Sequence, residues 1–153
     1  MAAPKGNEFY QLVKMPTGRP KKYTPEELWN TAQEYFKWVH EHPLMERKLF
    51  NYQGIVVEGD LPKMRAMTET AFCLYAEIDL DTFSNYKSNK DPYQDFFGVA
   101  SAISQIIYTQ KLEGAAADFL NANIIARDLG LRERTETEVK GVEAIRIIRD
   151  ANV

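Results

Sequence analysis

A short polar stretch near the middle of the chain carries the chemistry that nucleic acids require. It combines small hydrogen-bonding side chains, which suit base edges, with lysines, which suit phosphates. The stretch contains Thr82, Ser84, Asn85, Lys87, Asn89 and Lys90. The alternative interpretation is an ordinary helical corner whose outer face is polar because it meets water. Spacing alone leaves both interpretations open, and Asn85, Lys87 and Lys90 are the candidate DNA contacts.

A second basic group stands near the N-terminus, in the sequence GRPKKYT. Arg19, Lys21 and Lys22 flank Pro20, and cations beside a stiff proline can lie in a narrow minor groove. Residues 1–23 are rich in Pro and Gly, which predicts a flexible basic arm. A solvated basic linker is the alternative.

The C-terminal segment, residues 132–153, balances five basic side chains against five acidic ones, so it is not a basic tail. Polar and β-branched residues alternate from Thr135 to Val142, which favours a short strand. Arg146 and Arg149 are reserve candidates for DNA contact.

Motifs for catalysis are missing from the sequence. We find no phosphate-binding G-x-x-x-x-G-K-[ST] loop and no cysteine or histidine spacing typical of zinc or iron. His40 and His42 have no nearby serine or cysteine partner. We therefore expect no enzyme activity, no cofactor and no metal ion.

Composition limits the class of protein further. The net charge is −3, so nucleic acid binding needs locally concentrated cations. Cys73 is the single cysteine, which excludes a disulfide framework and fits a cytosolic location. It lies in an apolar helical pattern and is expected to be inert packing. No run of about 20 apolar residues is present, so we expect no membrane partner.

The first predicted helix begins at Thr24. Thr24 is a good N-cap, Pro25 suits the first turn, and Glu27 completes a capping box. Apolar residues at helical spacing follow, and the helix is expected to end near Glu41, before Pro43.

Aromatic and β-branched residues then flank Gln53-Gly54, which predicts a β-hairpin over about residues 47–58. A lone hairpin is marginal in water, so it must pack on helices or on another subunit.

The segment from about 69 to 88 has the spacing of a helix-turn-helix-like corner. Apolar or small residues stand at positions that let two short helices cross. They are Phe72, Cys73, Ala76, Ile78, Phe83 and Tyr86. Glu77 occupies the turn position where glycine is usual.

A long helix is predicted from Tyr93 to Glu113, followed by a break or bend at Gly114 and a second helix over residues 114–131. Drawn at 100° per residue, this second helix is apolar on two sides. One side carries Phe119, Ala122, Ile125, Ala126 and Leu129, and the other carries Ala116, Ala117, Leu120 and Ile124. Such a helix must be sandwiched, by another copy or by the first helix or the hairpin, and self-association is the favoured explanation.

These elements predict a mainly α fold with a β-hairpin, a helix-turn-helix-like corner, a long central helical hairpin for self-association and a short C-terminal β segment. We expect a basic arm at 1–23, a helical domain at 24–92, oligomerisation helices at 93–131 and a strand or tail at 132–153. Glycine at position 130 is expected to end the last helix.

Several stretches resemble one protein family. The most specific runs from Gln110 through KLEGAAADFLNANIIARDLGL to Leu131. Others are MAAPKGN at the start, Leu28-Trp29, Glu34-Tyr35-Phe36, Trp38-Val39, Pro43-Leu44, Tyr52-Gln53-Gly54 and PKMRAMT at 62–68. Over residues 1 to about 131 the chain resembles the terminase small subunits of tailed bacteriophages.

This resemblance implies a homo-oligomeric ring that binds double-stranded viral concatemeric DNA. It also implies recruitment and regulation of the terminase large subunit, an ATPase and nuclease, during genome packaging in the host cell cytoplasm. The candidate oligomerisation residues are Phe96, Ile103, Ile107, Ala116, Leu120, Ile124 and Arg127. By analogy, the C-terminal strand joins its equivalents in a small β crown, and the extreme C-terminus contacts the large subunit.

Two other functions remain open from the residues alone. One is a dimeric helix-turn-helix transcription regulator, which needs neither a ring nor a large subunit. The other is a structural phage adaptor protein, whose polar face at 82–90 touches only protein.

Overall fold

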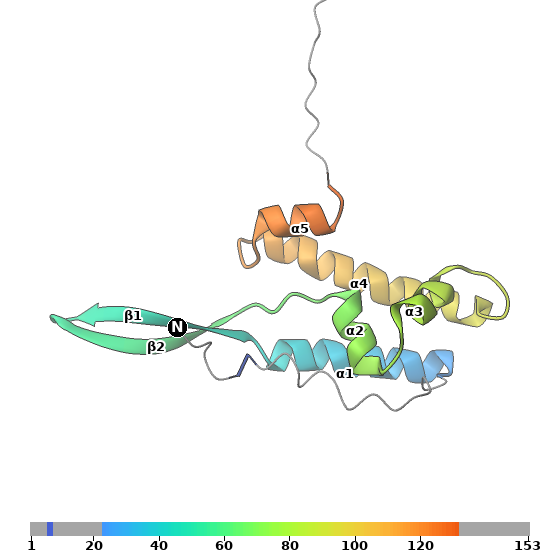
Figure 1. Ribbon diagram of the computed structural model, residues 1–153, viewed down its shortest axis with the longest axis horizontal. Helices are drawn as coiled ribbons and strands as arrows, with labels where there is room; N and C mark the ends of the chain where they lie inside the picture. Colours follow the sequence, from blue (N-terminus) through green and yellow to red (C-terminus); the bar gives the residue numbers. More distant parts are fainter. Residues whose placement is uncertain (1–5, 8–22, 132–153) are drawn as a thin grey trace, which may run out of the picture.

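Helices dominate the computed structural model, which describes residues 6–7 and 23–131. In chain order the elements are α1 (Pro25–Glu41), β1 (Leu44–Tyr52), β2 (Ile55–Lys63), α2 (Glu69–Ala76), α3 (Leu80–Lys87), the 3₁₀ turn η2 (Gln94–Phe96), α4 (Phe97–Ala116) and α5 (Ala122–Asp128). The helices pack into one body, and the hairpin β1–β2 projects from it (Figure 1). The expectation of a mainly α fold with a hairpin is confirmed.

Helix α1 begins and ends where the sequence predicts. The Thr24 hydroxyl accepts a hydrogen bond from the Glu27 amide at 3.2 Å, and the Glu27 carboxylate accepts one from the Thr24 amide at 2.9 Å. This reciprocal pair is the capping box, which satisfies two amides that lack partners inside the helix. The buried residues are those of the predicted stripe: Leu28, Ala32, Tyr35 and Val39.

Most buried hydrophobic side chains of the described residues form one cluster shared by α1, α2, α3 and α4. Tyr35 of α1 lies at its centre, with its ring centroid 5.7 Å from that of Phe72. Helix α4 contributes Ile103 and Ile107, which are 0% and 1% exposed. We predicted both isoleucines as subunit contacts. They instead fill the core of their own subunit, because their stripe is the side of α4 that meets α1 and α3.

The hairpin is confirmed and is longer than predicted. Its antiparallel register runs from Leu44 opposite Lys63 to Tyr52 opposite Ile55. Gln53 and Gly54 form the turn with φ values of 52° and 82°. Positive φ at both central residues gives a two-residue turn whose twist matches that of the strands.

At its base, the hairpin is tied to the start of the chain. The Asn7 side-chain amide donates to the Met45 carbonyl at 3.0 Å, and the Met45 amide donates to the Asn7 side-chain oxygen at 2.9 Å.

Helices α2 and α3 meet in a tight corner. All six residues at the predicted crossing positions are buried, and Phe72 meets Phe83 edge to face at 5.3 Å. Glu77 ends α2 in the left-handed conformation, with φ 57°. The Ile78 amide reaches back to the Cys73 carbonyl at 3.0 Å, the pattern of a Schellman cap.

A break or bend was predicted at Gly114, and the break is wrong, because α4 continues through Gly114 to Ala116. A Cβ atom at this position would lie 2.9 Å from both the Leu120 side chain and the Met64 sulfur. Glycine is therefore present for close packing rather than for a break. The helix ends a few residues later, where Asp118 takes a left-handed conformation with φ 58°.

The single helix predicted over residues 114–131 is therefore also wrong. Residues 117–121 form a turn, and α5 occupies only Ala122–Asp128, folded back over the end of α4 (Figure 1). The turn changes the rotational phase between residues 116 and 122, so the two-sided pattern drawn for one helix does not exist. The C-terminal cap is confirmed: Gly130 has φ 68°, and the Leu131 amide bonds to the Ala126 carbonyl at 2.9 Å.

Replacing Glu77 by glycine should stabilise the protein by about 0.5–1 kcal/mol, because a left-handed residue with a Cβ is strained. Thermal unfolding followed by circular dichroism would measure the change. Glu77→Ala is the matched control, since it removes the same charge and keeps the Cβ. Equal stability of Glu77→Gly and Glu77→Ala would contradict a backbone origin.

Candidate nucleic-acid interface and assembly surface

The predicted DNA-contacting residues of the α2–α3 corner differ in their exposure to solvent. Asn85 and Lys90 are exposed, and Lys87 at the end of α3 is half-buried. The side chain of Thr68 caps α2 by accepting from the Ala71 amide at 3.0 Å, while Asp79 precedes α3 without such a bond. The two helices are confirmed, and a helix-turn-helix role for them stays a prediction.

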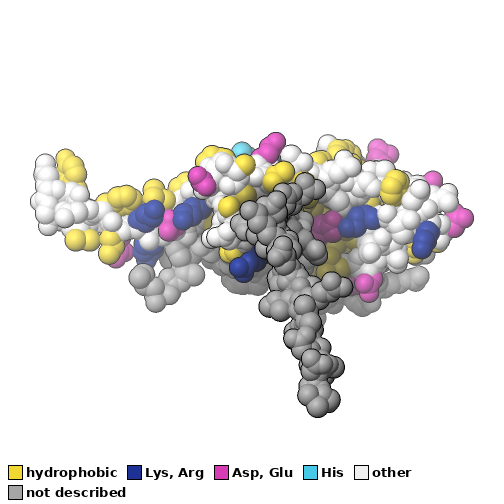
Figure 2. All heavy atoms as spheres, turned by 90° about the horizontal axis from the view of Figure 1, so that it is seen from above, with side chains coloured by type: hydrophobic (Ala, Val, Ile, Leu, Met, Phe, Trp, Pro, Cys, Tyr) yellow, Lys and Arg dark blue, Asp and Glu magenta, His cyan; other side chains and the backbone are white. Residues whose placement is uncertain are grey.

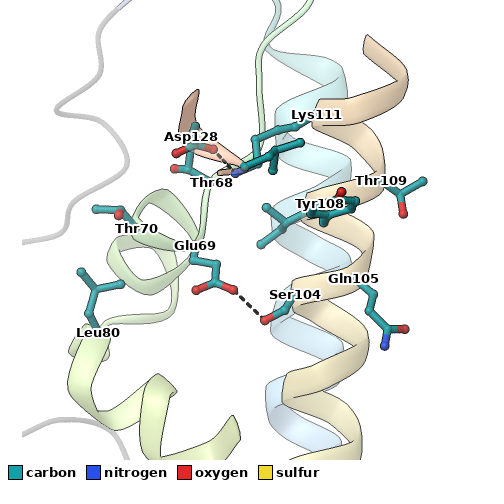
Figure 3. A pocket seen from close by; sticks show the side chains of 12 residues that line it. Thr68, Glu69, Thr70, Leu80, Ser104, Gln105, Tyr108, Thr109, Lys111 and Asp128 are labelled. Atoms are coloured by element: carbon teal, nitrogen blue, oxygen red, sulfur yellow. Dashed lines mark hydrogen bonds and ion pairs between the residues drawn. The ribbon is translucent and has the colours of Figure 1, made fainter. Parts of the chain in front are cut away.

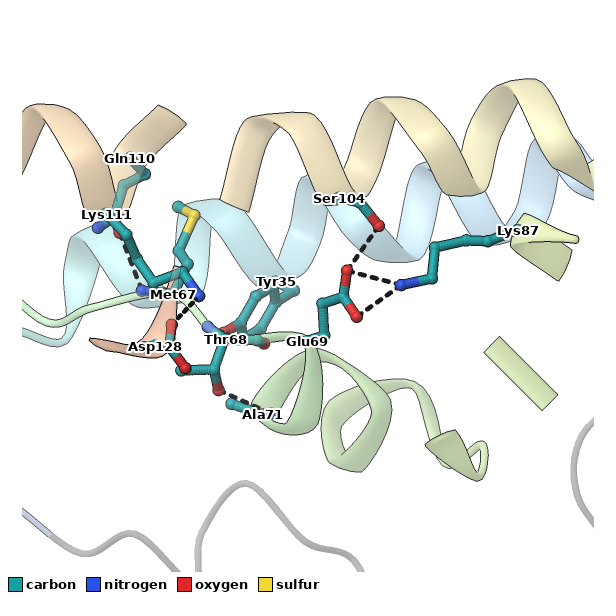
Figure 4. A network of polar contacts seen from close by, with 10 residues as sticks. All are labelled: Tyr35, Met67, Thr68, Glu69, Ala71, Lys87, Ser104, Gln110, Lys111 and Asp128. Carbon is teal, nitrogen blue, oxygen red and sulfur yellow. Dashed lines mark hydrogen bonds and ion pairs between the residues drawn. The ribbon is translucent and has the colours of Figure 1, made fainter. Parts of the chain in front are cut away.

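Lys87 is held inside its own subunit (Figure 4). Its ammonium group donates to both oxygens of the Glu69 carboxylate, at 2.7 and 2.9 Å, and lies 5.0 Å from the centre of the Phe83 ring. Ser104 of α4 donates to the same carboxylate at 2.7 Å. The network joins α2, α3 and α4. The positive charge of Lys87 is therefore balanced by Glu69 within the subunit in the absence of DNA.

The protonation of Glu69 reflects this network. Burial raises the pKa of the Glu69 carboxyl, but hydrogen bonds from Lys87 and Ser104 and the charges of Lys87 and Lys111 outweigh burial. The pKa therefore lies below its usual range, and the carboxylate is charged at neutral pH. Cys73 behaves differently: burial raises the pKa of its thiol to about 12, which leaves it unreactive.

Acidic residues surround the start of α3. Glu77, Asp79 and Asp81 are all exposed there, where a DNA-reading helix would approach phosphates. Between residues 23 and 131 the chain has nine Lys and Arg against sixteen Asp and Glu, a net charge of −7. The corner is therefore a poor electrostatic match for DNA.

The remaining predicted DNA contacts, Arg19, Lys21, Lys22, Arg146 and Arg149, lie outside the described residues. The sequence itself divides their charge unevenly. Residues 1–22 hold five basic side chains and one acidic one, while residues 132–153 hold five of each. The excess of basic over acidic residues in the sequence is thus concentrated before residue 23.

A hollow of about 840 Å³ lies between α2, α4 and α5 (Figure 3). Lys111 and Asp128 form an ion pair at its edge, and Lys111 is only 8% exposed. This pair fixes α5 on α4. The sequence did not reveal it, because its members lie on different helices. The lining also includes Ser104 and the Glu69 carboxylate, which is already paired with Lys87.

The candidate oligomerisation residues are scattered. Besides the buried Ile103 and Ile107, Phe96 is half-buried and stacks on Tyr86 with ring centroids 4.2 Å apart, and Leu120 is half-buried against Gly114. Ala116, Ile124 and Arg127 are exposed, with Ile124 at 64%. Only these last three are available at the surface of one subunit.

Within residues 6–7 and 23–131, no three His, Cys, Asp or Glu side chains converge as a metal site would require. In the same part of the chain, no helix has both the length and the apolar character needed to cross a membrane.

Comparison with known proteins identifies the family. Residues 18–137 match the model of the family described as DNA-packaging protein gp3. The chain is also 47% identical over 138 residues to the terminase small subunit of Salmonella phage P22, covering 90% of this chain and 83% of that protein. The chain therefore belongs to the gp3 family of DNA-packaging proteins and is a phage terminase small subunit.

Replacing Glu69 by glutamine should destabilise the protein by about 1 kcal/mol at pH 7, a modest value because solvent screens a pair that is one-third exposed. The difference from the unsubstituted protein should shrink below about pH 4.3, the ordinary carboxyl pKa. The reason is that a carboxyl with a lowered pKa stabilises the fold only while it is ionised. Urea unfolding across pH measures this, and a pH-independent difference would contradict the ion pair.

Proposed function

We propose that this terminase small subunit is a non-catalytic, ring-forming DNA-recognition component of a viral packaging motor. The observation that carries the proposal is the family match over residues 18–137 together with 47% identity to a terminase small subunit. Packaging would take place in the cytoplasm of the host cell.

A small subunit implies a large one. We propose that the ring binds viral concatemeric DNA and recruits and regulates the terminase large subunit, which supplies the ATPase and nuclease activities. The proposal assigns no bond-breaking step to this chain.

For DNA contact, the charge distribution favours the basic segment before α1 over the α2–α3 corner. Arg19, Lys21 and Lys22 directly precede Tyr23, whose hydroxyl donates to the Ala76 carbonyl at 2.7 Å. This bond attaches the end of the basic segment to the folded body. The body has a net charge of −7, so phosphate binding would depend on cations outside it.

Replacing Arg19, Lys21 and Lys22 together by alanine should weaken duplex binding and flatten its salt dependence. Each phosphate contact contributes about 0.9 to the slope of log K against log salt, so three lost contacts per engaged subunit remove about 2.7. Fluorescence anisotropy at several salt concentrations measures the slope.

The matched comparison is Asn85→Ala with Lys90→Ala on the exposed face of α3, which should leave the slope nearly unchanged. A larger loss of slope in this double variant than in the triple variant would instead assign DNA recognition to the α2–α3 corner.

Assembly multiplies these contacts. A few cations per subunit become a continuous basic belt when copies repeat around DNA, and binding strengthens with the number of phosphates neutralised. The proposed ring thus compensates for the small number of cations that one chain offers to DNA.

Light scattering of the purified chain at micromolar concentration should give one discrete mass well above twice 17.6 kDa. A mass of two chains would favour the dimeric regulator that the sequence left open. A mass equal to that of one chain would contradict the proposed ring.

A further inference from the structure

The outer half of the hairpin carries an apolar face that its own chain leaves uncovered. Register places Phe50 opposite Val57 and Tyr52 opposite Ile55, and alternation along the strands puts both pairs on one face. These side chains are between 44% and 69% exposed. The hairpin projects from the helices in Figure 1, and hydrophobic side chains line it in Figure 2. Because an isolated two-stranded hairpin is marginal in water, this face requires a cover.

The distribution of charge on the hairpin limits which kind of partner can cover its apolar face. Residues 49–57 contain no charged side chain. At the hairpin base, Arg47 pairs with Asp60 at 3.1 Å, and Lys63 pairs with Glu46 at 2.8 Å. A surface whose nearby cations are already paired has little attraction for phosphates, which argues against nucleic acid as the occupant.

A second surface without charge lies on α4. The sequence from residue 96 to residue 110 has no charged side chain, although Gln105, Tyr108 and Thr109 are exposed. In Figure 3, Gln105 and Thr109 point away from α2. A helix that faces water ordinarily carries charges on that face. We call the exposed side of α4 that carries Gln105, Tyr108, Thr109 and Leu112 the outer face of α4.

We propose that the apolar hairpin face of one copy packs on the outer face of α4 in a second copy. This inference rests on the proposed ring and names its contact. Two bodies that each carry −7 repel, so they meet most easily where neither surface has charge. Hairpin and α4 are different elements, so the contact is heterologous, and each copy keeps one free surface of each kind. Heterologous contacts of this sort close into rings when the rotation between neighbouring copies closes.

Two variants of the full chain separate the two surfaces. The hairpin variant, Ile55→Thr with Val57→Thr, removes apolar groups and keeps β-branched residues in the strand. The α4 variant, Gln105→Glu with Thr109→Lys, places opposite charges four residues apart, which favours the helix and leaves the net charge unchanged. Leu49→Thr with Val56→Thr is the matched control, because these residues lie on the opposite face of the hairpin and are 67% and 65% exposed, against 67% and 48% for Ile55 and Val57.

Native mass spectrometry provides the readout, with circular dichroism to show that each variant keeps its helices. We expect the unsubstituted chain and the control to assemble, and the hairpin and α4 variants each to remain monomers. Mixed together, these two variants should form a heterodimer of twice 17.6 kDa and nothing larger. The reason is that the pair has one intact hairpin face and one intact α4 face that can meet.

Other outcomes overturn the contact in distinguishable ways. If both variants assemble like the unsubstituted chain, the result would contradict this contact but not the proposed ring. Dimers of the α4 variant alone would indicate contact between hairpins. A control that fails to assemble would indicate that the opposite hairpin face makes the contact. If the unsubstituted chain stays monomeric, the result would contradict both the proposed ring and the proposed contact.

Discussion

Burial of one side of α4 against α1, α2 and α3 is the interaction on which the rest of the structure depends. Ile103 and Ile107 are almost fully buried beside Tyr35, Phe72 and Phe83, and each contributes about 1.5–3 kcal/mol through burial. The Glu69 carboxylate joins Lys87 of α3 to Ser104 of α4 across the same boundary. With α4 fixed in this way, its opposite side must face outward. The lack of charge on that outward side is therefore a property of the molecular surface and not of the core.

The distribution of charge separates the part of the chain suited to DNA recognition from the surfaces suited to assembly. The folded body has a net charge of −7, and the 22 residues before it hold five cations and one acid. Charge-rich surfaces of the body repel DNA and other copies of the chain, whereas the basic segment attracts phosphates. Surfaces without charge, on the hairpin and on α4, are left for contact between copies. DNA recognition and assembly can thus use different parts of one small chain.

Local signals in the sequence predicted the local structure well. The capping box at Thr24, the turn at Gln53-Gly54 and the apolar spacing of the α2–α3 corner each depend on residues close together in the chain. The failures came from contacts between distant residues. Gly114 is explained by Met64, fifty residues earlier, and Lys87 is neutralised by Glu69 on another helix. The charge-free stretch at 96–110 was visible in the sequence, but the two-sided pattern was assigned to residues 114–131, where a turn disrupts it.

The central claim is that neighbouring copies cover the uncharged surfaces of the hairpin and α4. Hydroxyl-radical footprinting of Tyr52 and Tyr108, which are 69% and 41% exposed in one subunit, tests it most directly. The account predicts that both tyrosines become protected as the protein is concentrated from nanomolar to micromolar and assembles. Equal reactivity of both tyrosines in the dilute and the assembled protein would contradict it.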